Sequence, residues 1–168
     1  MSYEIRALHR DDVKSHFDCG VPELNTYFKK YAIKNGDSGI SRTFVLLSDN
    51  VICGFYALCM SNVESAKLPP AVTKLPGYPI PVALIAQLAV DKNHRRKDFG
   101  GALLFDSFKR SLSFRDDIGI YGIVTDARDQ DAVNFYKHFD FVLLEECAQW
   151  PRRMFIAMTV LQTLFQQP

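Results

Sequence analysis

The stretch Leu84–Phe108 reads LIAQLAVDKNHRRKDFGGALLFDSF and sets the fold class. An apolar run of strand length, Pro81–Val90, precedes a basic turn, Lys92–Lys97, and the pair Gly100-Gly101 then begins a helical pattern. This order is typical of phosphate-binding sites, because the N–H groups and the dipole at a helix N-terminus favour an anion. A solvated, glycine-bearing turn explains the same residues equally well, so the choice depends on the rest of the chain.

The composition indicates one globular domain over residues 1–168. Of the 168 residues, 48% are apolar and 23% are charged, which is enough to bury a core. The net charge of +1 gives no general affinity for polyanions, so a nucleic-acid surface requires a local basic patch. The N-terminus lacks a hydrophobic signal core, and no run reaches about 20 apolar residues. We therefore expect a cytoplasmic protein without a membrane contact.

The cysteines show neither a CxxC pair nor a His/Cys spacing typical of metal ligands, so we expect no metal site. Each has apolar neighbours, which favours buried, reduced thiols. The four are Cys19, Cys53, Cys59 and Cys147.

Hydrophobic periodicity predicts alternating strands and helices. Strands are predicted at Tyr3–Leu8, Thr43–Leu47, Ile52–Met60, Pro81–Val90, Ile118–Asp126, Phe141–Leu144 and Met154–Thr159. Helical spacing is predicted from Pro22 to Asn35-Gly36, from Gly100 to Leu112, at Ala132–His138 and at Val160–Phe165.

One helix face and two connections complete the prediction. In the first helix, a core-facing stripe of Leu24, Tyr27, Phe28 and Tyr31 accounts for the aromatic residues. Ser48-Asp49-Asn50 is a hairpin signal. Ser65–Pro81 is a Pro- and Lys-rich loop, which we expect at the rim of a binding site. The whole pattern is mixed α/β, with meander strands first and two βα units after them.

Several motifs now identify a resemblance that covers nearly the whole chain. Arg95–Gly100 resembles the R/Q-x-x-G-x-G/A loop of the GNAT N-acetyltransferase family, and Phe135–Phe141 resembles its FYxxxGF segment. The match is closer to the GNAT toxins of type II toxin–antitoxin pairs. The segments similar to that branch are Phe17–Phe28 (FDCGVPELNTYF), Pro81–Asp91 (PVALIAQLAVD) and Pro151-Arg152-Arg153.

The resemblance implies a GNAT acyl-CoA N-acyltransferase fold, with a central, mostly antiparallel sheet of six or seven strands flanked by helices. It implies transfer of an acetyl group from acetyl-CoA to an amine. In the toxin branch the amine is the α-amino group of an aminoacyl-tRNA, and its acetylation blocks translation. A homodimer and a small ribbon-helix-helix antitoxin partner are also implied.

The same resemblance assigns the cofactor-binding residues. The amide-rich pantetheine arm would pair with the backbone of the central strand, as an added strand does. The loop and the helix start would bind the pyrophosphate with amides and cations. Two residues of the predicted helix Ala132–His138 complete the set. The predicted cofactor-binding residues are Leu88, Ala89, Val90, Arg95, Arg96, Lys97, Asp98, Phe99, Gly100, Gly101, Ala102, Asn134 and Phe135. For Asn134, a solvated helix position is an equally good interpretation.

Tyr136 holds the position of the family's general acid, which protonates the departing thiolate. A half-buried tyrosine packed on the sheet is the alternative. No general base is assigned, because the amine of a charged tRNA has a lowered pKa and water would suffice as the proton acceptor.

A tRNA substrate requires a basic surface around the acetyl site, and its binding would fall steeply with salt. His94 is expected at the mouth of this site, and Lys137 lies at the end of an element that should reach it. The residues assigned to this surface are Lys92, Arg42, Arg128, Arg152 and Arg153. Scattered solvated charges are the alternative for each one.

The sequence departs from the family pattern at three positions. Asp98 and Asp140 replace motif glycines, and Gln87 replaces an arginine of the toxin motif. Aspartate tolerates a left-handed backbone better than most residues, so both turns are expected to form. A carboxylate near the pyrophosphate repels it, however, so replacing Asp98 with glycine is expected to tighten acetyl-CoA binding.

Two other functions fit the same residues. One is a GNAT enzyme that acetylates a small amine or a protein N-terminus. The other is a catalytically weakened GNAT-fold binding module that acts through a partner.

Overall fold

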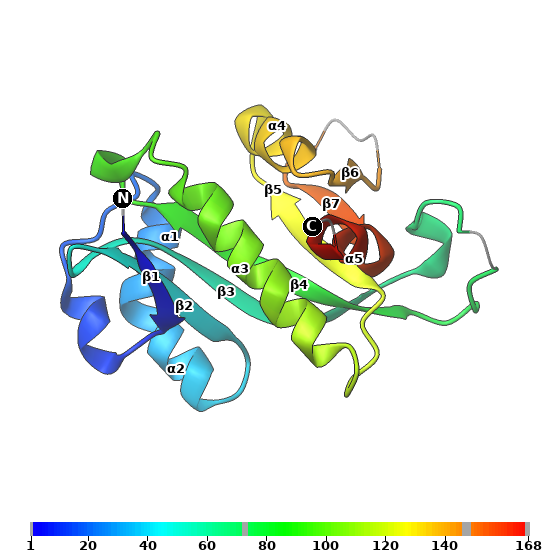
Figure 1. Cartoon of the computed structure of the whole chain (residues 1–168), viewed down its shortest axis with the longest axis horizontal. Coiled ribbons are helices and arrows are strands. Elements are labelled where there is room, and N and C mark those ends of the chain that lie inside the picture. The colour runs from blue at the N-terminus through cyan, green and yellow to red at the C-terminus, as the bar shows by residue number, and fades with distance from the viewer. Residues whose placement is uncertain (1, 72–73, 146–148, 167–168) are drawn as a thin grey trace. The chain divides into compact units, whose positions relative to one another are not determined.

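The structure is a computed structural model that describes residues 2–71, 74–145 and 149–166 (Figure 1). Its strands are β1 (Glu4–Ala7), β2 (Arg42–Ser48), β3 (Val51–Val63), β4 (Ile80–Val90), β5 (Gly122–Ala127), β6 (Val142–Leu143) and β7 (Arg152–Ala157). Its α-helices are α1 (Pro22–Thr26), α2 (Ala32–Asp37), α3 (Phe99–Phe114), α4 (Gln130–His138) and α5 (Met158–Gln166). Short helical turns are η1 (Arg10–Lys14), η2 (Tyr27–Tyr31), η3 (Ser65–Lys67) and η4 (Lys92–His94).

Within the described part of the chain, the strands form a 7-stranded sheet in the order β1-β2-β3-β4-β5-β7-β6. The pairs β1–β2, β2–β3, β5–β7 and β6–β7 are antiparallel. The predicted mixed α/β fold is therefore confirmed. The chain divides into two compact units, Met1–Cys59 with Ile85–Lys109 and Met60–Leu84 with Arg110–Pro168. A single domain over residues 1–168 stays a prediction.

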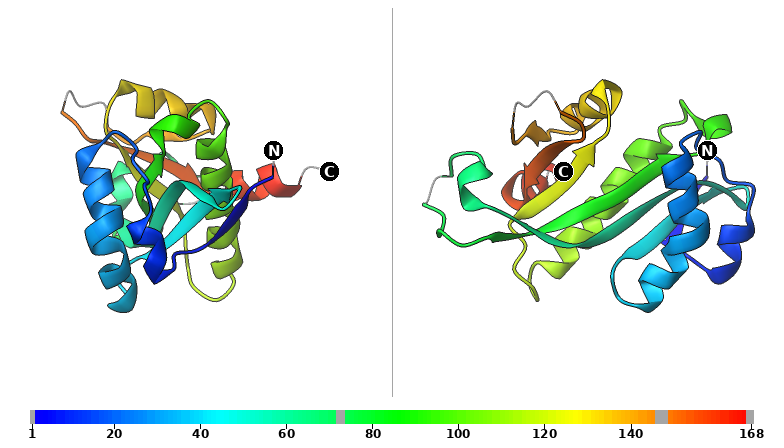
Figure 2. Two further views of the ribbon diagram at one scale, coloured as in Figure 1. Left: turned by 90° about the vertical axis from the view of Figure 1, so that its left-hand side faces the viewer. Right: turned by 180° about the vertical axis from the view of Figure 1, so that it is seen from behind.

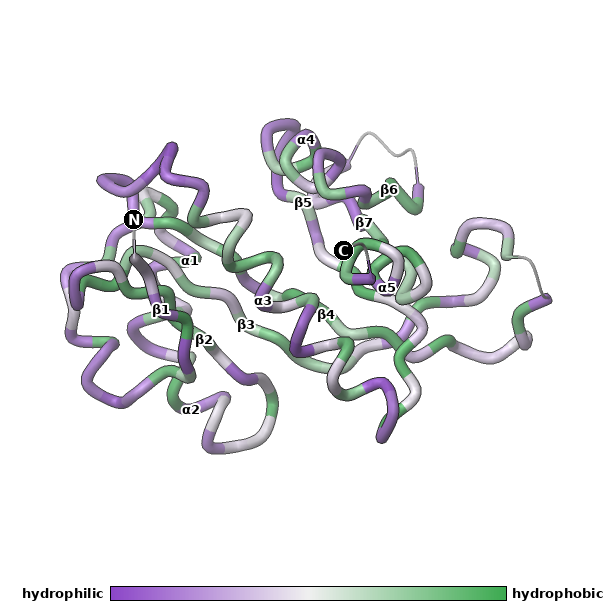
Figure 3. Tube along the Cα trace, viewed as in Figure 1, coloured by the Kyte–Doolittle hydropathy of each residue, from purple (hydrophilic) through white to green (hydrophobic). Residues whose placement is uncertain are grey.

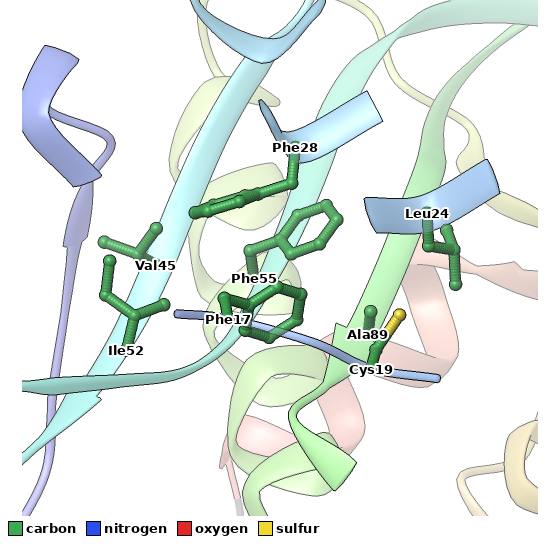
Figure 4. Packing of buried hydrophobic residues seen from close by; sticks show 8 residues of the cluster. All are labelled: Phe17, Cys19, Leu24, Phe28, Val45, Ile52, Phe55 and Ala89. Carbon is green, nitrogen blue, oxygen red and sulfur yellow. The ribbon is translucent and has the colours of Figure 1, made fainter. Parts of the chain in front are cut away.

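In the first unit, the helices α1–α2 and the helix α3 cover opposite sides of strands β2–β4 (Figure 2). The core under α1–α2 is an aromatic cluster of Phe17, Phe28 and Phe55, whose ring centroids lie 4.9, 5.1 and 5.4 Å apart (Figure 4). All three side chains are buried. Such pairs add about 0.5–1.5 kcal/mol to the free energy gained from burial alone, so this cluster holds the helices on the sheet.

The hairpin between β2 and β3 forms where it was predicted. Asp49 and Asn50 have φ angles of 51° and 63°. Positive φ at both central residues is the signature of a type I′ turn, whose twist matches the twist of the flanking strands.

The predicted aromatic stripe of the first helix is wrong at Tyr31, which is 50% exposed. The buried positions are instead Leu24, Phe28 and Ala32. The reason is the π-type turn η2, in which the N–H of Ala32 bonds to the carbonyl of Tyr27. A π turn inserts one residue into the helix and rotates the following side chains away from the core. The helix also ends at Asp37, slightly beyond the predicted stop.

In the second unit, the apolar residues of β5 and β7 meet the residues that flank η3. The buried cluster consists of Val63, Leu68, Ile80, Val82, Val124 and Phe155. The loop predicted at Ser65–Pro81 contains η3, and β4 begins at Ile80. Its place at the rim of a binding site stays a prediction.

The strand boundaries in this unit differ from the prediction, and β6 spans only Val142–Leu143 of the predicted Phe141–Leu144. The strand predicted at Ile118–Asp126 begins only at Gly122. The residues before it belong to the turn that ends α3, where the N–H groups of Asp117 and Ile118 bond to the carbonyl of Phe114. Ile118 is 56% exposed, so its apolar character does not mark a strand.

The last strand, predicted at Met154–Thr159, is β7 and begins at Arg152. The guanidinium of Arg153 bonds both oxygens of Asp126 on β5 at 2.9 and 3.0 Å, which makes this charged residue a favourable strand partner. Thr159 belongs to α5, the helix predicted from the spacing of the C-terminal apolar residues. Cys19 and Cys53 are buried thiols as predicted, Cys59 is half-buried, and Cys147 lies outside the described residues.

Candidate active site

The loop between β4 and α3, together with the first turn of α3, carries most of the predicted cofactor residues. It follows the strand residues Leu88 and Val90, which are half-buried, and Ala89, which is buried. The strand continues into the loop through a hydrogen bond from the Asp91 N–H to the Cys53 carbonyl of β3, at 2.8 Å. Figure 3 shows the loop as a hydrophilic segment after the apolar strand.

Asp91 organises the first half of the loop. Its carboxylate accepts a hydrogen bond from the Asn93 N–H at 2.8 Å and caps η4. It also lies 3.2 Å from Nδ1 of His94. Burial alone would raise the pKa of Asp91, but the N–H groups of Asp18 and Asn93 and the His94 ring together lower it. The carboxyl is therefore ionised at neutral pH and acts as a fixed acceptor.

The second half of the loop turns into α3 through two left-handed residues. Arg96 has a φ of 63° and Asp98 a φ of 58°. The Ala102 N–H bonds to the Asp98 carbonyl at 3.1 Å and closes the first turn of the helix. The N–H groups of Phe99, Gly100 and Gly101 come before this bond, and such groups have no acceptor within their own helix. This turn therefore presents main-chain donors and the positive end of a 16-residue helix, which fits a pyrophosphate.

The side chains of this loop and of the first residue of α3 lie in different environments. Nη2 of Arg95 donates to the Cys19 carbonyl at 2.8 Å, so part of this guanidinium is engaged within the protein. Arg96 and Lys97 are exposed. Phe99 is buried, with its ring 6.1 Å from that of Tyr3, and so belongs to the core.

Tyr136 lies on α4, in the second unit. The helix begins at Gln130 and is capped by Asp129, whose carboxylate accepts from the Ala132 N–H at 2.8 Å. The Tyr136 hydroxyl is 3.5 Å from Oγ1 of Thr125, which donates to it. Burial raises the pKa of Tyr136 above its ordinary value, and Thr125 only partly offsets this effect. The phenol is therefore neutral at pH 7 and holds a proton that it can donate.

The turn after α4 forms despite the loss of the family glycine. Asp140 has a φ of 69°. Its N–H bonds to the Lys137 carbonyl at 3.1 Å, and the Phe141 N–H bonds to the Tyr136 carbonyl at 3.2 Å. This is a Schellman motif with aspartate at the left-handed position, where glycine is usual. The ring of Phe141 then packs 5.3 Å from that of Tyr136.

The other two predicted residues of α4 differ in environment. Asn134 is exposed, and its Oδ1 accepts from the side chain of Gln130 at 3.0 Å. Phe135 is half-buried, with its ring 5.1 Å from that of Tyr136.

Three of the predicted basic residues come together in the second unit. Asp126 and Ala127 of β5 pair with Arg153 and Arg152 of β7, and Arg128 follows directly. The guanidinium of Arg152 stacks 4.2 Å from the Trp150 ring, and its buried Nε has no hydrogen-bond partner among the residues described. Arg152 and Arg153 line a cleft of about 360 Å³.

The two basic residues predicted in the first unit are not brought together. Nζ of Lys92 forms an ion pair with Asp18 at 2.7 Å. Arg42 pairs with Leu58 of β3, five residues beyond the Cys53 that bonds to Asp91, and its guanidinium donates to the Gly36 carbonyl at 3.1 Å.

Comparison with known proteins places the chain in a family. Residues 39–143 match the family model described as "Acetyltransferase (GNAT) domain". The chain belongs to the GNAT acetyltransferase family, as its motifs predicted. It is 40% identical over 131 residues to the tRNA-acetylating toxin of Mycobacterium tuberculosis (strain ATCC 25618 / H37Rv), an alignment that covers 78% of each protein.

Solved structures support the same placement. AtaT complexed with acetyl-methionyl-tRNAfMet superposes with a TM-score of 0.87 at 25% identity, covering 98% of this chain and 100% of the other. AtaTR bound with AcCoA superposes with a TM-score of 0.81 at 26% identity, covering 98% of each chain. Within residues 2–71, 74–145 and 149–166, no helix combines the length and apolarity needed to cross a bilayer.

Proposed function

We propose that this chain transfers the acetyl group of acetyl-CoA to the α-amino group of an aminoacyl-tRNA, and so acts as a toxin that blocks translation. The observation that carries the proposal is the turn into α3. There, the left-handed Asp98 leads into main-chain N–H groups that have no acceptor within the helix. The relatives support the choice of substrate. One is named a tRNA-acetylating toxin, and another is solved with an acetylated methionyl-tRNA.

The residues of the loop and of β4 would hold the coenzyme. The main-chain groups of Leu88–Val90 would pair with the pantetheine amides. The N–H groups of residues 99–101, with the exposed Arg96 and Lys97, would bind the pyrophosphate. The predicted contribution of the Ala102 N–H is wrong, because this group bonds to the Asp98 carbonyl within the helix. Asn134 and Phe135 would contact the coenzyme from α4.

Tyr136 would act as the general acid. Acetyl-CoA supplies a thioester, whose carbonyl carbon forms the new bond to the amine nitrogen while the carbon–sulfur bond breaks. The neutral phenol of Tyr136 donates its proton to the departing sulfur, and water takes the proton lost by the amine. The raised pKa of the buried phenol supports this role, because the proton stays on the oxygen at neutral pH.

The partners follow from the same proposal. Arg128, Arg152 and Arg153 would contact the tRNA backbone at the end of β5 and β7, and Arg42 is a further predicted contact. Lys92, which the sequence also predicted as a contact, is held in an ion pair with Asp18. The protein would be a cytoplasmic homodimer that a small ribbon-helix-helix antitoxin neutralises.

One observation favours a second candidate, the acetylation of a small amine or a protein N-terminus. Lys92 is paired with Asp18, and Arg153 is paired with Asp126 at 2.9 Å. Paired cations attract phosphates less than free ones do, which weakens the case for a polyanionic acceptor.

The test is acetyl transfer by the purified protein to purified aminoacyl-tRNA, with a small amine and a peptide N-terminus as competing acceptors. We expect acetylated aminoacyl-tRNA from the wild type. With Tyr136→Phe, we expect a rate lower by about 10²–10⁴-fold, because general acid catalysis contributes that much. Transfer to the small amine or peptide alone would establish the second candidate. An unchanged rate with Tyr136→Phe would remove this residue from the mechanism.

A further inference from the structure

The segment Phe17–Asn25, called here the clamp segment, is joined to the β4–α3 loop by main-chain and side-chain hydrogen bonds. The Asp18 N–H donates to Oδ2 of Asp91 at 3.0 Å, and the Lys92 N–H donates to the Asp18 carbonyl at 2.9 Å. Further along, Arg95 donates to the carbonyl of Cys19 at 2.8 Å. The clamp segment therefore contacts the loop at Asp91–Lys92 and again at Arg95. More than 70 residues separate the clamp segment from the loop in sequence.

The Asp18 carboxylate is the centre of this contact. It accepts hydrogen bonds from Nζ of Lys92 at 2.7 Å, from the Gly20 N–H at 2.8 Å and from Nδ2 of Asn25 at 2.7 Å. The Lys92 ammonium, followed by these two other donors, holds the pKa of Asp18 well below its usual range. The Asp18 charge thus links the loop to the turn of the clamp segment.

Asn25 fixes the other side of the turn. Its Oδ1 accepts from the Cys19 N–H at 3.0 Å, while its Nδ2 donates to Asp18. The amide thus accepts with one atom and donates with the other, which an ionised carboxylate at this position cannot do because it only accepts. Gly20 lies at the bend with a φ of 81°, which disfavours any side chain there.

The loop requires such support. Arg96 and Asp98 both adopt left-handed φ angles, which cost free energy in a residue other than glycine and persist only where surrounding contacts fix them. Main-chain donors at a helix start bind a phosphate well only if they converge before the ligand arrives.

We propose that the clamp segment positions the coenzyme-binding loop, with Asp18 and Asn25 as positioning residues. Lys92 then serves the loop through its pair with Asp18 and is not a contact for RNA. The identity of the ligand, coenzyme A, rests on the proposed function. The positioning itself does not, because it concerns the conformation of the free protein.

The first experiment measures amide hydrogen exchange of the loop in the ligand-free protein. Asp18→Asn keeps the shape of the side chain but removes the charge that Lys92 binds. Asp11→Asn is the matched control, because it removes an exposed ion pair, Asp11–Lys14 at 2.9 Å, far from the loop in sequence. We expect residues 92–98 to exchange at least about threefold faster in Asp18→Asn and at the wild-type rate in Asp11→Asn. Unchanged exchange in Asp18→Asn would overturn the proposal.

The second experiment measures the Kd for coenzyme A by calorimetry, with Tm recorded for each variant. We expect Asp18→Asn and Lys92→Met each to raise Kd by about three- to tenfold. The double variant should be no weaker than the worse single one, since both changes remove one interaction. Lys92→Arg, which retains the charge, should restore most of the affinity. Asn25→Asp, which places a second carboxylate against Asp18, should also raise Kd.

The outcomes separate the two proposals. Altered exchange together with wild-type protein that binds no coenzyme A would overturn the proposed function and leave the positioning role standing. A lowered Tm with unchanged Kd and unchanged loop exchange would mean that Asp18 only stabilises the fold. An unchanged Kd in Lys92→Met, with weaker binding of charged tRNA, would return Lys92 to the RNA surface and overturn its assignment here.

Discussion

Asp98 and Asp140 show how single residues adapt to a backbone suited to glycine. Both have positive φ angles, 58° and 69°. The short polar side chain of aspartate tolerates this region better than most others, as the sequence predicted. Both turns therefore form without glycine. At Asp98, the negative charge is expected to act on an anionic ligand.

Two variants of Asp98 separate charge from conformation. Asp98→Asn removes the charge and keeps the tolerance for positive φ, whereas Asp98→Gly also removes the conformational cost. We expect both to lower the Kd for acetyl-CoA by at least about tenfold, since like charges within about 4–6 Å repel by a few kcal/mol at an effective dielectric near 20 and about 1.4 kcal/mol is a tenfold change. Calorimetric titration measures the Kd of each variant for acetyl-CoA. Tighter binding in Asp98→Gly alone would assign the effect to the backbone, and equal or weaker binding in both would contradict the repulsion.

At the scale of elements, β3 lies very close to β4, the strand whose main chain is predicted to pair with the pantetheine arm. A Cβ added to Gly54 on β3 would lie 2.9 Å from the carbonyl oxygen of Ala89 on β4 and 2.8 Å from Cδ1 of Leu103 on α3. Distances this short force the neighbouring groups to move. A glycine at this position therefore fixes the place of the Ala89 main chain.

We expect Gly54→Ala to destabilise the protein by about 1–3 kcal/mol, as overpacking in a core does. It should also weaken coenzyme A binding, because the Ala89 backbone has to shift. Gly119→Ala is the control, since nothing lies within 4 Å of its added Cβ. Urea unfolding measures the free energy of unfolding, and calorimetry measures the Kd for coenzyme A. A Gly54→Ala protein of wild-type stability would contradict the close approach.

The helix α4 illustrates how local signals place a functional side chain. Asp129 caps its start and the Schellman motif at Asp140 ends it, so both boundaries are fixed by the chain's own residues. Tyr136 and Val133 are then buried on the inner face, while Asn134 is exposed. The sequence identified this helix but could not establish the environment of Tyr136, which depends on Thr125 of β5.

At the scale of the molecule, the first unit gathers several carboxylates whose pKa values are lowered. Asp18, Asp91 and Asp12 all have lowered pKa values. For Asp12, burial alone would raise the pKa, but the Arg6 guanidinium at 2.8 Å and the His9 N–H outweigh this effect. Groups with lowered pKa values bind protons more weakly in the folded than in the unfolded state. Their stabilisation is therefore present above the unfolded pKa of about 4 and is lost as the pH falls below it.

We therefore expect the free energy of unfolding to decrease on acidification from pH 5 towards pH 2. Urea unfolding across this range measures the slope. Asp12→Asn should make the slope shallower, whereas Asp11→Asn, which changes a residue in an exposed ion pair, should not. A slope equal in wild type and Asp12→Asn would show that the Arg6–Asp12 contact is not coupled to folding.

The sequence by itself determined the element order, the β2–β3 hairpin and the helix start after the basic loop. These depend on local periodicity, turn chemistry and capping, which neighbouring residues specify. Its motifs also identified the family, which the comparisons confirmed. The roles given to individual site residues stay predictions.

Only the tertiary structure decided which charges are paired and which side chains are buried. The sequence offered Lys92 and Arg153 as free cations, yet each faces a carboxylate from a distant segment, Asp18 and Asp126. It missed Asp18 and Asn25 as supports of the loop, although both lie within the recognised motif Phe17–Phe28. The exposure of Tyr31 likewise followed from a π turn. In each case, the physical reason is that pairing and burial depend on contacts made across the fold, which spacing along the chain does not encode.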